Sequence, residues 1–162
     1  MTGPVYKLHP AEFADYFKHM TRIDVAGRNE RFKGASDDAS LQAHALRLAI
    51  SETIVLGIRL DGDIRATIEI MPSQTGQTAT AALMVEPVYR GHGLGRRLLE
   101  EAVTASRPLG IRSLLFDVNT TNEAMVHLIT TMNAKPTSQK GLYTLNLERR
   151  SIPREDEVAL RA

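Results

Sequence analysis

The sequence contains no cysteine among its 162 residues. This absence excludes disulfide bonds, a thiolate nucleophile and a zinc site built on cysteine. It is compatible with a reducing compartment, and the first ten residues lack the basic and apolar regions of a signal peptide. We therefore expect a cytoplasmic protein.

The sequence also lacks an excess of positive or negative charge, and it lacks long apolar runs. Twenty Lys and Arg residues against 19 Asp and Glu residues give a formal net charge of +1, so no global field favours nucleic acid or an anionic membrane. No apolar run reaches the roughly 20 residues that a membrane-spanning helix needs. The remaining composition is typical of one globular domain, which we place at residues 1–149, followed by a charged tail at 150–162.

Several catalytic signatures are absent as well. The five histidines show no His-Glu-x-x-His spacing, so we expect no metal site. No Gly-x-Ser-x-Gly elbow is present, which argues against a serine hydrolase. The Gly-Lys-Ser or Gly-Lys-Thr of a nucleotide-hydrolase phosphate loop is missing too.

Periodicity nevertheless predicts a clear order of helices and strands. An Asp-Gly pair separates two β-branched runs, "TIVLGIRL" and "IRATIEIM", and this is a strong hairpin signal. Besides these two arms, the predicted strands cover 5–9, 78–86, 113–118 and 141–148. The predicted helices cover 11–20, 40–48 and 93–107, with a last one capped by Thr120 and Glu123. We expect a loop with at most a helical turn at 21–38, and a strand buried on both faces at 113–118.

The stretch "VEPVYRGHGLGRRLLEEAV", residues 85–103, places Gly91, Gly93 and Gly95 between a strand and a helix. Each glycine costs conformational entropy on folding, so something there requires the bare backbone. Amides at a helix start lack intrahelical partners and carry the positive end of the helix dipole. Together with neighbouring arginines they predict a cradle for phosphate or pyrophosphate. The dinucleotide fingerprint does not fit, because its third glycine would stand at Arg96.

From Arg90 onward this stretch resembles the core motif of the GNAT acyltransferase superfamily, Arg/Gln-x-x-Gly-x-Gly/Ala, with Gly93 and Gly95 at the small positions. The run Asn-x-x-Met-x-x-Leu from Asn122 resembles the motif that follows in that family. The order of elements also agrees over residues 5–148. The resemblance implies an α/β fold with a mixed central sheet of about six to seven strands, splayed at its centre and flanked by about four helices.

The resemblance also implies acetyl-CoA as co-substrate and no metal. The pantetheine arm would lie beside the strand that ends at Val85, and the backbone amides of residues 91–96 would hold the pyrophosphate. The residues that it assigns to the coenzyme are Met84, Val85, Arg90, Gly91, His92, Gly93, Leu94, Gly95, Arg96 and Asn122. The implied reaction is direct acetyl transfer to a primary amine of a small molecule or peptide, and homodimers are common in the family.

Two acid–base positions depart from the family pattern. Thr80 stands where many members have a strand glutamate, and Ile129 stands where many have a tyrosine that acts as general acid. A primary amine has a pKa of about 10.4, so only about one in a thousand is neutral at pH 7 and a base is required. The departures leave a non-catalytic acyl-CoA-binding regulatory domain as the alternative to an acetyltransferase.

Three residues remain as catalytic candidates, namely Glu69, Glu86 and Tyr143. Glu69 lies mid-strand and either faces the cleft or points outward from a half-exposed strand. Glu86, at a strand end, is either a base or a loop-edge carboxylate in water. Tyr143, on the last strand, is the candidate to approach the departing thiolate, and a strand amide near Val85 is the expected donor to the thioester oxygen.

The segment "RNERF", residues 28–32, corresponds to a region that borders the acceptor site in this family. Arg28 and Arg31 either bind a carboxylate on the acceptor or form a solvated pair above Phe32. The first reading predicts an acidic acceptor.

Overall fold

Seven strands form one mixed sheet in this computed structural model, which describes residues 3–33 and 37–148. Their order across the sheet is β1-β2-β3-β4-β5-β7-β6. Their bounds are β1 (Val5–Lys7), β2 (Ile54–Leu60), β3 (Asp63–Pro72), β4 (Thr78–Val85), β5 (Ser113–Asp117), β6 (Lys135–Pro136) and β7 (Leu142–Asn146). The predicted α/β fold with a mixed sheet is confirmed, whereas the charged tail predicted at 150–162 lies outside the described residues.

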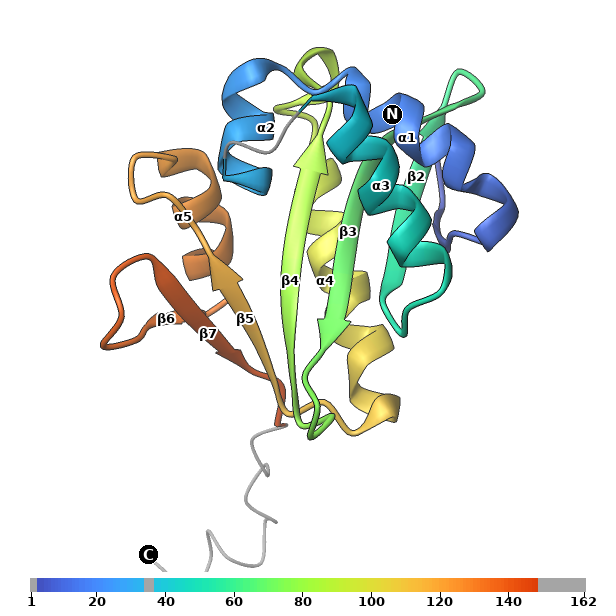
Figure 1. The fold of residues 1–162 in the computed structure, drawn as a ribbon. Helices are drawn as coiled ribbons and strands as arrows, with labels where there is room; N and C mark the ends of the chain where they lie inside the picture. The colour runs from blue at the N-terminus through green and yellow to red at the C-terminus, as the bar shows by residue number, and fades with distance from the viewer. Residues whose placement is uncertain (1–2, 34–36, 149–162) are drawn as a thin grey trace, which may run out of the picture.

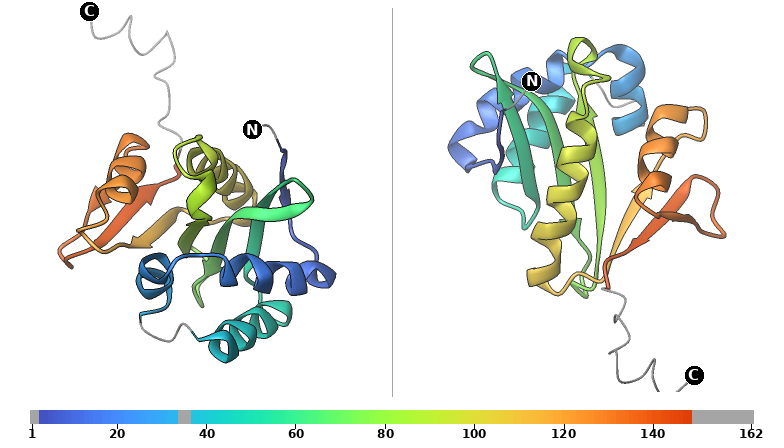
Figure 2. Two further views of the ribbon diagram at one scale, coloured as in Figure 1. Left: turned by 90° about the horizontal axis from the view of Figure 1, so that it is seen from above. Right: turned by 180° about the vertical axis from the view of Figure 1, so that it is seen from behind.

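Helices cover both faces of the sheet (Figure 1). The α-helices of the described chain are α1 (Phe13–Thr21), α2 (Val25–Phe32), α3 (Asp38–Ala49), α4 (Leu94–Ser106) and α5 (Glu123–Thr131). Short 3₁₀ turns occur at Pro10–Glu12, Pro87–Tyr89 and Arg107–Leu109. Seen from above, α1, α2 and α3 lie on one side of the sheet, and α4 and α5 lie on the other (Figure 2). No helix in the described part of the chain is long and apolar enough to cross a membrane.

The predicted hairpin joins β2 to β3 through Asp61 and Gly62. Both residues have positive φ, 54° and 83°, which is the backbone that a two-residue type I′ turn requires. Leu60 and Asp63 pair directly across this turn, and β4 continues the meander antiparallel to β3.

Two apolar clusters fill the space between the sheet and its helices. The larger cluster joins the strands to the apolar stripe of α4, whose buried members include Leu94, Leu98, Leu99 and Ala102. The smaller cluster holds α1 and α3 against the opposite face and includes Leu41, Ala45 and Leu48 of α3. α1, α3 and α4 therefore each bury the stripe that the 3.6-residue period places on one side.

The sheet opens between β4 and β5. Within the described chain these parallel strands pair only where Thr78–Thr80 faces Ser113–Leu115, and beyond that point they diverge (Figure 1). The rest of β4, up to Val85, keeps an edge that β5 does not cover. β5 instead pairs along its whole length with β7. The predicted splay at the centre of the sheet is therefore present.

Three local predictions are wrong. The segment 21–38 is not mainly loop, because it contains α2, whose polar side chains pair with residues far away in sequence. β5 alternates between buried and partly exposed residues, because no described helix covers the face of β5 that looks toward the viewer in Figure 1. The cap of α5 is Asn122, whose side chain accepts a hydrogen bond from the Met125 amide at 3.2 Å, and not Thr120. The two-residue strand β6 was not predicted from the sequence.

The apolar stripe of α4 generates a stability prediction. Leu98 is fully buried, so Leu98→Ala removes transfer free energy and leaves a cavity, which lowers the free energy of unfolding by about 2–5 kcal/mol. Leu46→Ala is a matched control on α3, because Leu46 is 65% exposed. Urea denaturation of the two variants measures the difference. Similar losses in both would contradict the assignment of α4 to the core.

Candidate active site

A cavity of about 830 Å³ occupies the space between the diverging strands. Its walls are α2, the unpaired part of β4, the glycine loop, the end of β5 and the start of α5. The residues assigned to the coenzyme from the sequence all line this cavity except His92, which is exposed. The motif residues are thus brought to one place, and residues 23–33, around α2, form a further wall. The resemblance implied that residues 28–32 border the acceptor site, but the sequence did not predict that they form a helix.

The three glycines of the loop serve two different purposes. Gly91 and Gly93 have φ of 78° and 79°, and a Cβ on either would meet no atom within 4 Å. They are needed for their backbone conformation and leave open space in front of the helix start. Gly95 lies inside α4, where a Cβ would come within 3.0 Å of Leu83 and 3.2 Å of Leu128. It is needed for close packing of α4 on β4 and α5.

The start of α4 carries backbone amides without intrahelical acceptors. Gly93 is the N-cap and has no side chain to accept from them. The first accepted bond runs from the Arg97 amide to the Gly93 carbonyl at 3.2 Å, so the amides of Leu94, Gly95 and Arg96 remain available. This arrangement, at the positive end of the helix dipole, is suited to a phosphate group.

Backbone alternation decides which residue of β4 faces the opening. The Glu86 amide donates to the Arg65 carbonyl at 3.0 Å, on the side of β3. Neighbouring residues of a strand direct their backbone groups to opposite sides, so Val85 directs its amide toward the cavity, whereas Met84 uses its backbone toward Thr67 of β3. Of the two strand residues assigned to pantetheine, Val85 therefore has the accessible backbone.

Arg90 connects the glycine loop to α2. Its Nε donates to the Val85 carbonyl at 3.0 Å, and its Nη2 donates to Asp24 Oδ1 at 2.8 Å. The hydrogen bond from Arg90 lowers the pKa of Asp24. Gly27 permits this contact, since a Cβ there would lie 2.8 Å from Asp24 Oδ1 and 3.2 Å from the Arg90 guanidinium.

Asn122 joins the opposite wall to α2 through Glu30. While its Oδ1 caps α5, its Nδ2 donates to Glu30 Oε2 at 2.9 Å. Glu30 Oε1 accepts from the Asn119 amide at 3.3 Å. The amide group of Asn122 is therefore oriented by a helix on each side of the cavity.

Glu69 is fully buried and holds all three N-terminal helices. Its carboxylate accepts from Tyr16 of α1 and Arg31 of α2, and lies 2.7 Å from Nε2 of His44 on α3. Burial raises the pKa of Glu69, but the His44 hydrogen bond and the Arg31 charge together outweigh burial and lower it. Burial and the charge of Glu69 raise the pKa of Tyr16 well above its ordinary value. The expectation that Glu69 lies outward on a half-exposed strand is wrong.

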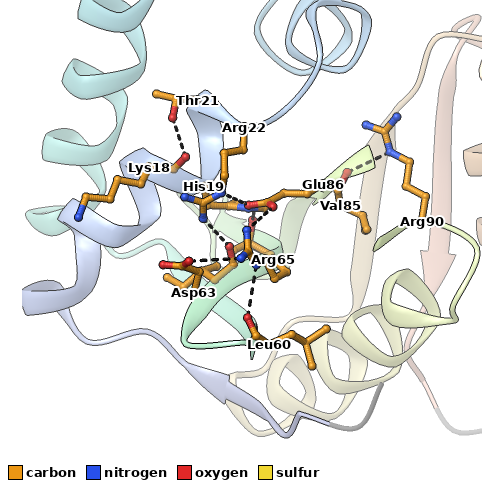
Figure 3. A network of polar contacts seen from close by, with 12 residues as sticks. Lys18, His19, Thr21, Arg22, Leu60, Asp63, Arg65, Val85, Glu86 and Arg90 are labelled. Carbon is orange, nitrogen blue, oxygen red and sulfur yellow. Dashed lines mark hydrogen bonds and ion pairs between the residues drawn. The ribbon is translucent and has the colours of Figure 1, made fainter. Parts of the chain in front are cut away.

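Glu86 is the centre of a second buried group, shown in Figure 3. It accepts from Arg22 Nε at 2.6 Å and Arg65 Nη1 at 3.0 Å, and lies 3.1 Å from Nδ1 of the buried His19. The other ring nitrogen of His19 lies 3.0 Å from Thr67 Oγ1. Glu86 is only 4% exposed, so it is not a loop-edge carboxylate in water. Despite burial, which raises it, its pKa is lowered by these three donors.

None of the three catalytic candidates is among the described residues that line the cavity. Glu69 and Glu86 have their oxygens occupied, and a carboxylate whose pKa is lowered is a weaker base. Tyr143 is half-buried on β7, opposite Phe116 and Pro136. Ile129 is buried in the larger core, and Thr80 lines the cavity. In the described ranges no group of three or more His, Asp or Glu residues is arranged to hold a metal ion.

The arginines of "RNERF" have partners. Arg31 lines the cavity but pairs with Glu69, and its guanidinium lies 4.9 Å from the centre of the Phe32 ring. The carboxylate of Glu69 already compensates the positive charge of Arg31, so that charge is not available to bind a carboxylate on an acidic acceptor. Glu30 and Asp24 were not predicted as site residues. The one signal for them in the sequence was the three-to-four-residue spacing of polar side chains in this segment, which is compatible with a short helix.

Comparison with known proteins agrees with this geometry. The model of the GNAT acetyltransferase family matches residues 15–133. The chain belongs to the GNAT acetyltransferase family. The matched segment contains most of α1, α2, α3, the glycine loop and α5, and hence every wall of the cavity. No match to a curated protein was found by sequence comparison.

Solved GNAT structures share the fold at low sequence identity. The GNAT domain of PAT from S. lividans is 18% identical with a TM-score of 0.76, over 90% of this chain and 91% of that one. The Salmonella typhimurium protein yncA, solved with its cofactor acetyl-CoA, is 16% identical with a TM-score of 0.70, over 94% and 98%. A phosphinothricin acetyltransferase from Sinorhizobium meliloti, in complex with acetyl-CoA, is 14% identical with a TM-score of 0.72, over 93% and 91%.

The network around Glu69 predicts a large loss of stability for Glu69→Gln. The substitution leaves the positive charge of Arg31, whose side chain is only 17% exposed, without its partner, so the free energy of unfolding falls by about 3–5 kcal/mol. Glu100→Gln is the control, because the Arg96–Glu100 pair is exposed and contributes little. Urea denaturation measures both. A Glu69→Gln variant as stable as the control would show that the network does not hold the helices.

The group around Glu86 predicts how stability responds to acid. Burial lowers the pKa of His19 more than Glu86 raises it, and Arg22 and Arg65 add to the lowering. Below the ordinary value of 6.5, the unfolded chain binds a proton that folded His19 does not bind. Stability therefore decreases as pH falls through this window, by at most about 1.4 kcal/mol per pH unit.

The variant His19→Gln isolates this contribution, since the other histidines are common to both proteins. We expect the difference in free energy of unfolding between wild type and variant to shrink from pH 8 to pH 5. A difference that grows on acidification would mean that His19 is protonated in the fold.

Proposed function

We propose that this chain is an acetyl-CoA-dependent N-acetyltransferase that moves the acetyl group directly to a primary amine. The observation that carries the proposal is the cavity between β4 and β5, because it joins an anion cradle and an unpaired strand edge in one space. Pyrophosphate and a chain of two amides are the parts of coenzyme A that such a space suits.

The residues present fit this co-substrate. The free amides of Leu94, Gly95 and Arg96 would hold the pyrophosphate, and the open space before Gly91 and Gly93 leaves room for it. The unpaired edge of β4 offers backbone groups to the pantetheine amides in the manner of an added strand. These assignments retain the motif residues of the loop and place Val85, rather than Met84, at the strand edge.

The coenzyme would supply an activated thioester, and the chain would position and polarise it. The Val85 amide, which points away from β3, is placed to donate to the thioester oxygen as negative charge develops there. The chain has no cysteine, so a thiolate of its own cannot carry the acetyl group. Direct attack by an amine held on the α2 side of the cavity is the route that these residues support.

A non-catalytic acyl-CoA-binding domain is the second candidate. It is favoured by Thr80 and Ile129, which occupy the family's acid–base positions and cannot perform that chemistry. Both candidates predict that the protein binds coenzyme A, and turnover separates them. We would measure thiol release from acetyl-CoA with a panel of alkylamines, arylamines, amino acids and peptides. Thiol release dependent on an amine supports the enzyme, and binding without turnover supports the second candidate.

Thermal unfolding with acetyl-CoA, coenzyme A and NAD tests the binding step. A ligand at 100 times its Kd adds about 2.7 kcal/mol, and each kcal/mol moves the midpoint by roughly 2–4 °C in a domain of this size. We expect a rise of several degrees with the two coenzyme A species alone. No rise at millimolar ligand would overturn the proposed cofactor.

Gly93→Ala tests the cradle against a matched control. Gly93 and Gly62 both have positive φ, 79° and 83°, with open space around them, so alanine at either costs about 1–2 kcal/mol of strain. Only Gly93 lines the cavity. We expect Gly93→Ala to abolish most of the acetyl-CoA-induced rise in midpoint, while Gly62→Ala retains it. Equal rises in both variants would place the ligand elsewhere.

A further inference from the structure

The cavity is lined by three carboxylates, and two of them are neutralised by cations. Asp24 is bonded to Arg90, and Asp117 Oδ1 lies 3.8 Å from Nζ of Lys33. The third, Glu30, accepts from the Asn119 backbone amide and the Asn122 side-chain amide, which are neutral. Among the described residues no cation pairs with Glu30. Within residues 3–33 and 37–148, its negative charge is therefore uncompensated in the cavity.

Glu30 also has acceptor capacity to spare. An ionised carboxylate offers about four lone-pair positions, and each oxygen of Glu30 uses one, toward Asn119 and Asn122. Glu69 differs in both respects, because three donors, one of them the cation Arg31, surround it and it is 0% exposed. Of the buried and partly buried glutamates near the sheet opening, Glu30 is the one that can accept from a further donor.

The unused acceptor positions of the Glu30 carboxylate lie on the side of the cavity where the amine would enter. Glu30 projects from α2 to Asn122 at the start of α5, and it lines the same cavity as Leu94, Gly95 and Arg96 of α4. In Figure 1, α2 lies above the opening between β4 and β5, on the side of the sheet opposite α4. An amine that enters beneath α2 would meet Glu30 before it reaches the edge of β4 at Val85.

We propose that Glu30 binds the acceptor as its ammonium ion and then accepts the proton that activates it. This inference rests on the proposed N-acetyltransferase function. The carboxylate takes one proton from the ammonium nitrogen, and the neutral amine forms a bond to the acetyl carbon while the carbon–sulfur bond breaks. The electron pair of that bond goes to sulfur, which takes the second proton from nitrogen. The proton on Glu30 then leaves to solvent, so the products are the acetamide, the free thiol and one proton.

The neighbouring charges leave this role to Glu30. Arg31 is paired with Glu69, Lys33 with Asp117, Arg90 with Asp24, and Arg96 with Glu100 at 3.0 Å. An incoming ammonium ion therefore meets four compensated pairs and, at Glu30, a carboxylate that no cation of the described residues neutralises. The same free charge disfavours a carboxylate on the acceptor close to its amine, which reverses the expectation of an acidic acceptor drawn from Arg28 and Arg31.

The experiment compares wild type, Glu30→Gln and Glu30→Asp with n-propylamine and aniline as acceptors. Glutamine preserves the shape and the acceptor oxygen but loses the charge and the basicity. A positioned base contributes about 100-fold to 10,000-fold, so we expect kcat/KM for n-propylamine at pH 7 to fall at least about 100-fold in Glu30→Gln. Activity toward aniline, which is neutral at pH 7, falls far less, and Glu30→Asp recovers part of the loss.

A pH profile separates this role from a structural one. In Glu30→Gln the rate with n-propylamine should rise about tenfold per pH unit until the amine itself is neutral, because only the neutral fraction reacts. Glu123→Gln is the matched control, since Glu123 is exposed beside Asn122 and does not line the cavity. Its rates and profile should equal those of wild type, and all variants should keep the midpoint rise with acetyl-CoA.

Three outcomes overturn the inference. An unchanged pH profile in Glu30→Gln removes the proton-accepting role but leaves the proposed function intact. An equal loss for both amines means that Glu30 positions the cavity walls and is not the base. Wild-type protein that binds acetyl-CoA but acetylates no amine in the panel overturns the enzyme and this inference together.

Discussion

The end of pairing between β4 and β5 after Thr80 is the constraint on which the site depends. Backbone N–H and C=O groups inside a protein need hydrogen-bond partners. Along an unpaired strand edge beside a cavity, several of these groups have no neighbouring strand to bond to. Arg90 satisfies one, the Val85 carbonyl, and is in turn held by Asp24, the N-cap of α2. The remaining edge stays open toward a space of about 830 Å³ that also receives the amides of α4. The opening therefore exposes a strand edge as a binding surface, and its unpaired backbone groups are suited to hydrogen bonds with a ligand that carries amide groups.

Buried carboxylates on the meander determine where the second wall of this cavity lies. Glu69 lies on β3 and reaches one side chain from each of α1, α2 and α3, while Glu86 fixes α1 through His19 and Arg22. Such groups are costly to bury unless every oxygen is bonded, and both carboxylates meet that condition. Two residues that resemble catalytic bases in the sequence thus orient the helices, and α2 brings Glu30 into the cavity as a result.

The parts of the fold that follow local rules could be predicted from the sequence. Asp61–Gly62 requires a type I′ turn, the Leu94–Leu98 stripe requires a buried helix face, and Gly91 and Gly93 mark the helix start. α2 could not be predicted in this way, because it buries no residue and its side chains are bonded to positions distant in sequence, such as Asp24 to Arg90 and Glu30 to Asn122. The burial of Glu69 has the same origin, since all three of its partners lie outside β3. Local patterns do not encode the pairing of a charge with a distant partner, and the acceptor side of the site consists of such pairs.

The two walls of the cavity differ in how they tolerate change. The coenzyme side depends on positive φ at Gly91 and Gly93 and on close packing at Gly95, where a Cβ would require Leu83 and Leu128 to move. A packed core behind it resists such shifts. The acceptor side is a two-turn helix whose contacts to the rest of the protein are mainly ion pairs and hydrogen bonds. Such contacts can be replaced one at a time without opening a void in the core. The same fold can therefore keep its coenzyme side and vary the opposite wall through substitutions on α2. Under the function proposed above, the charge of Glu30 would be the feature of this chain that selects a cationic amine.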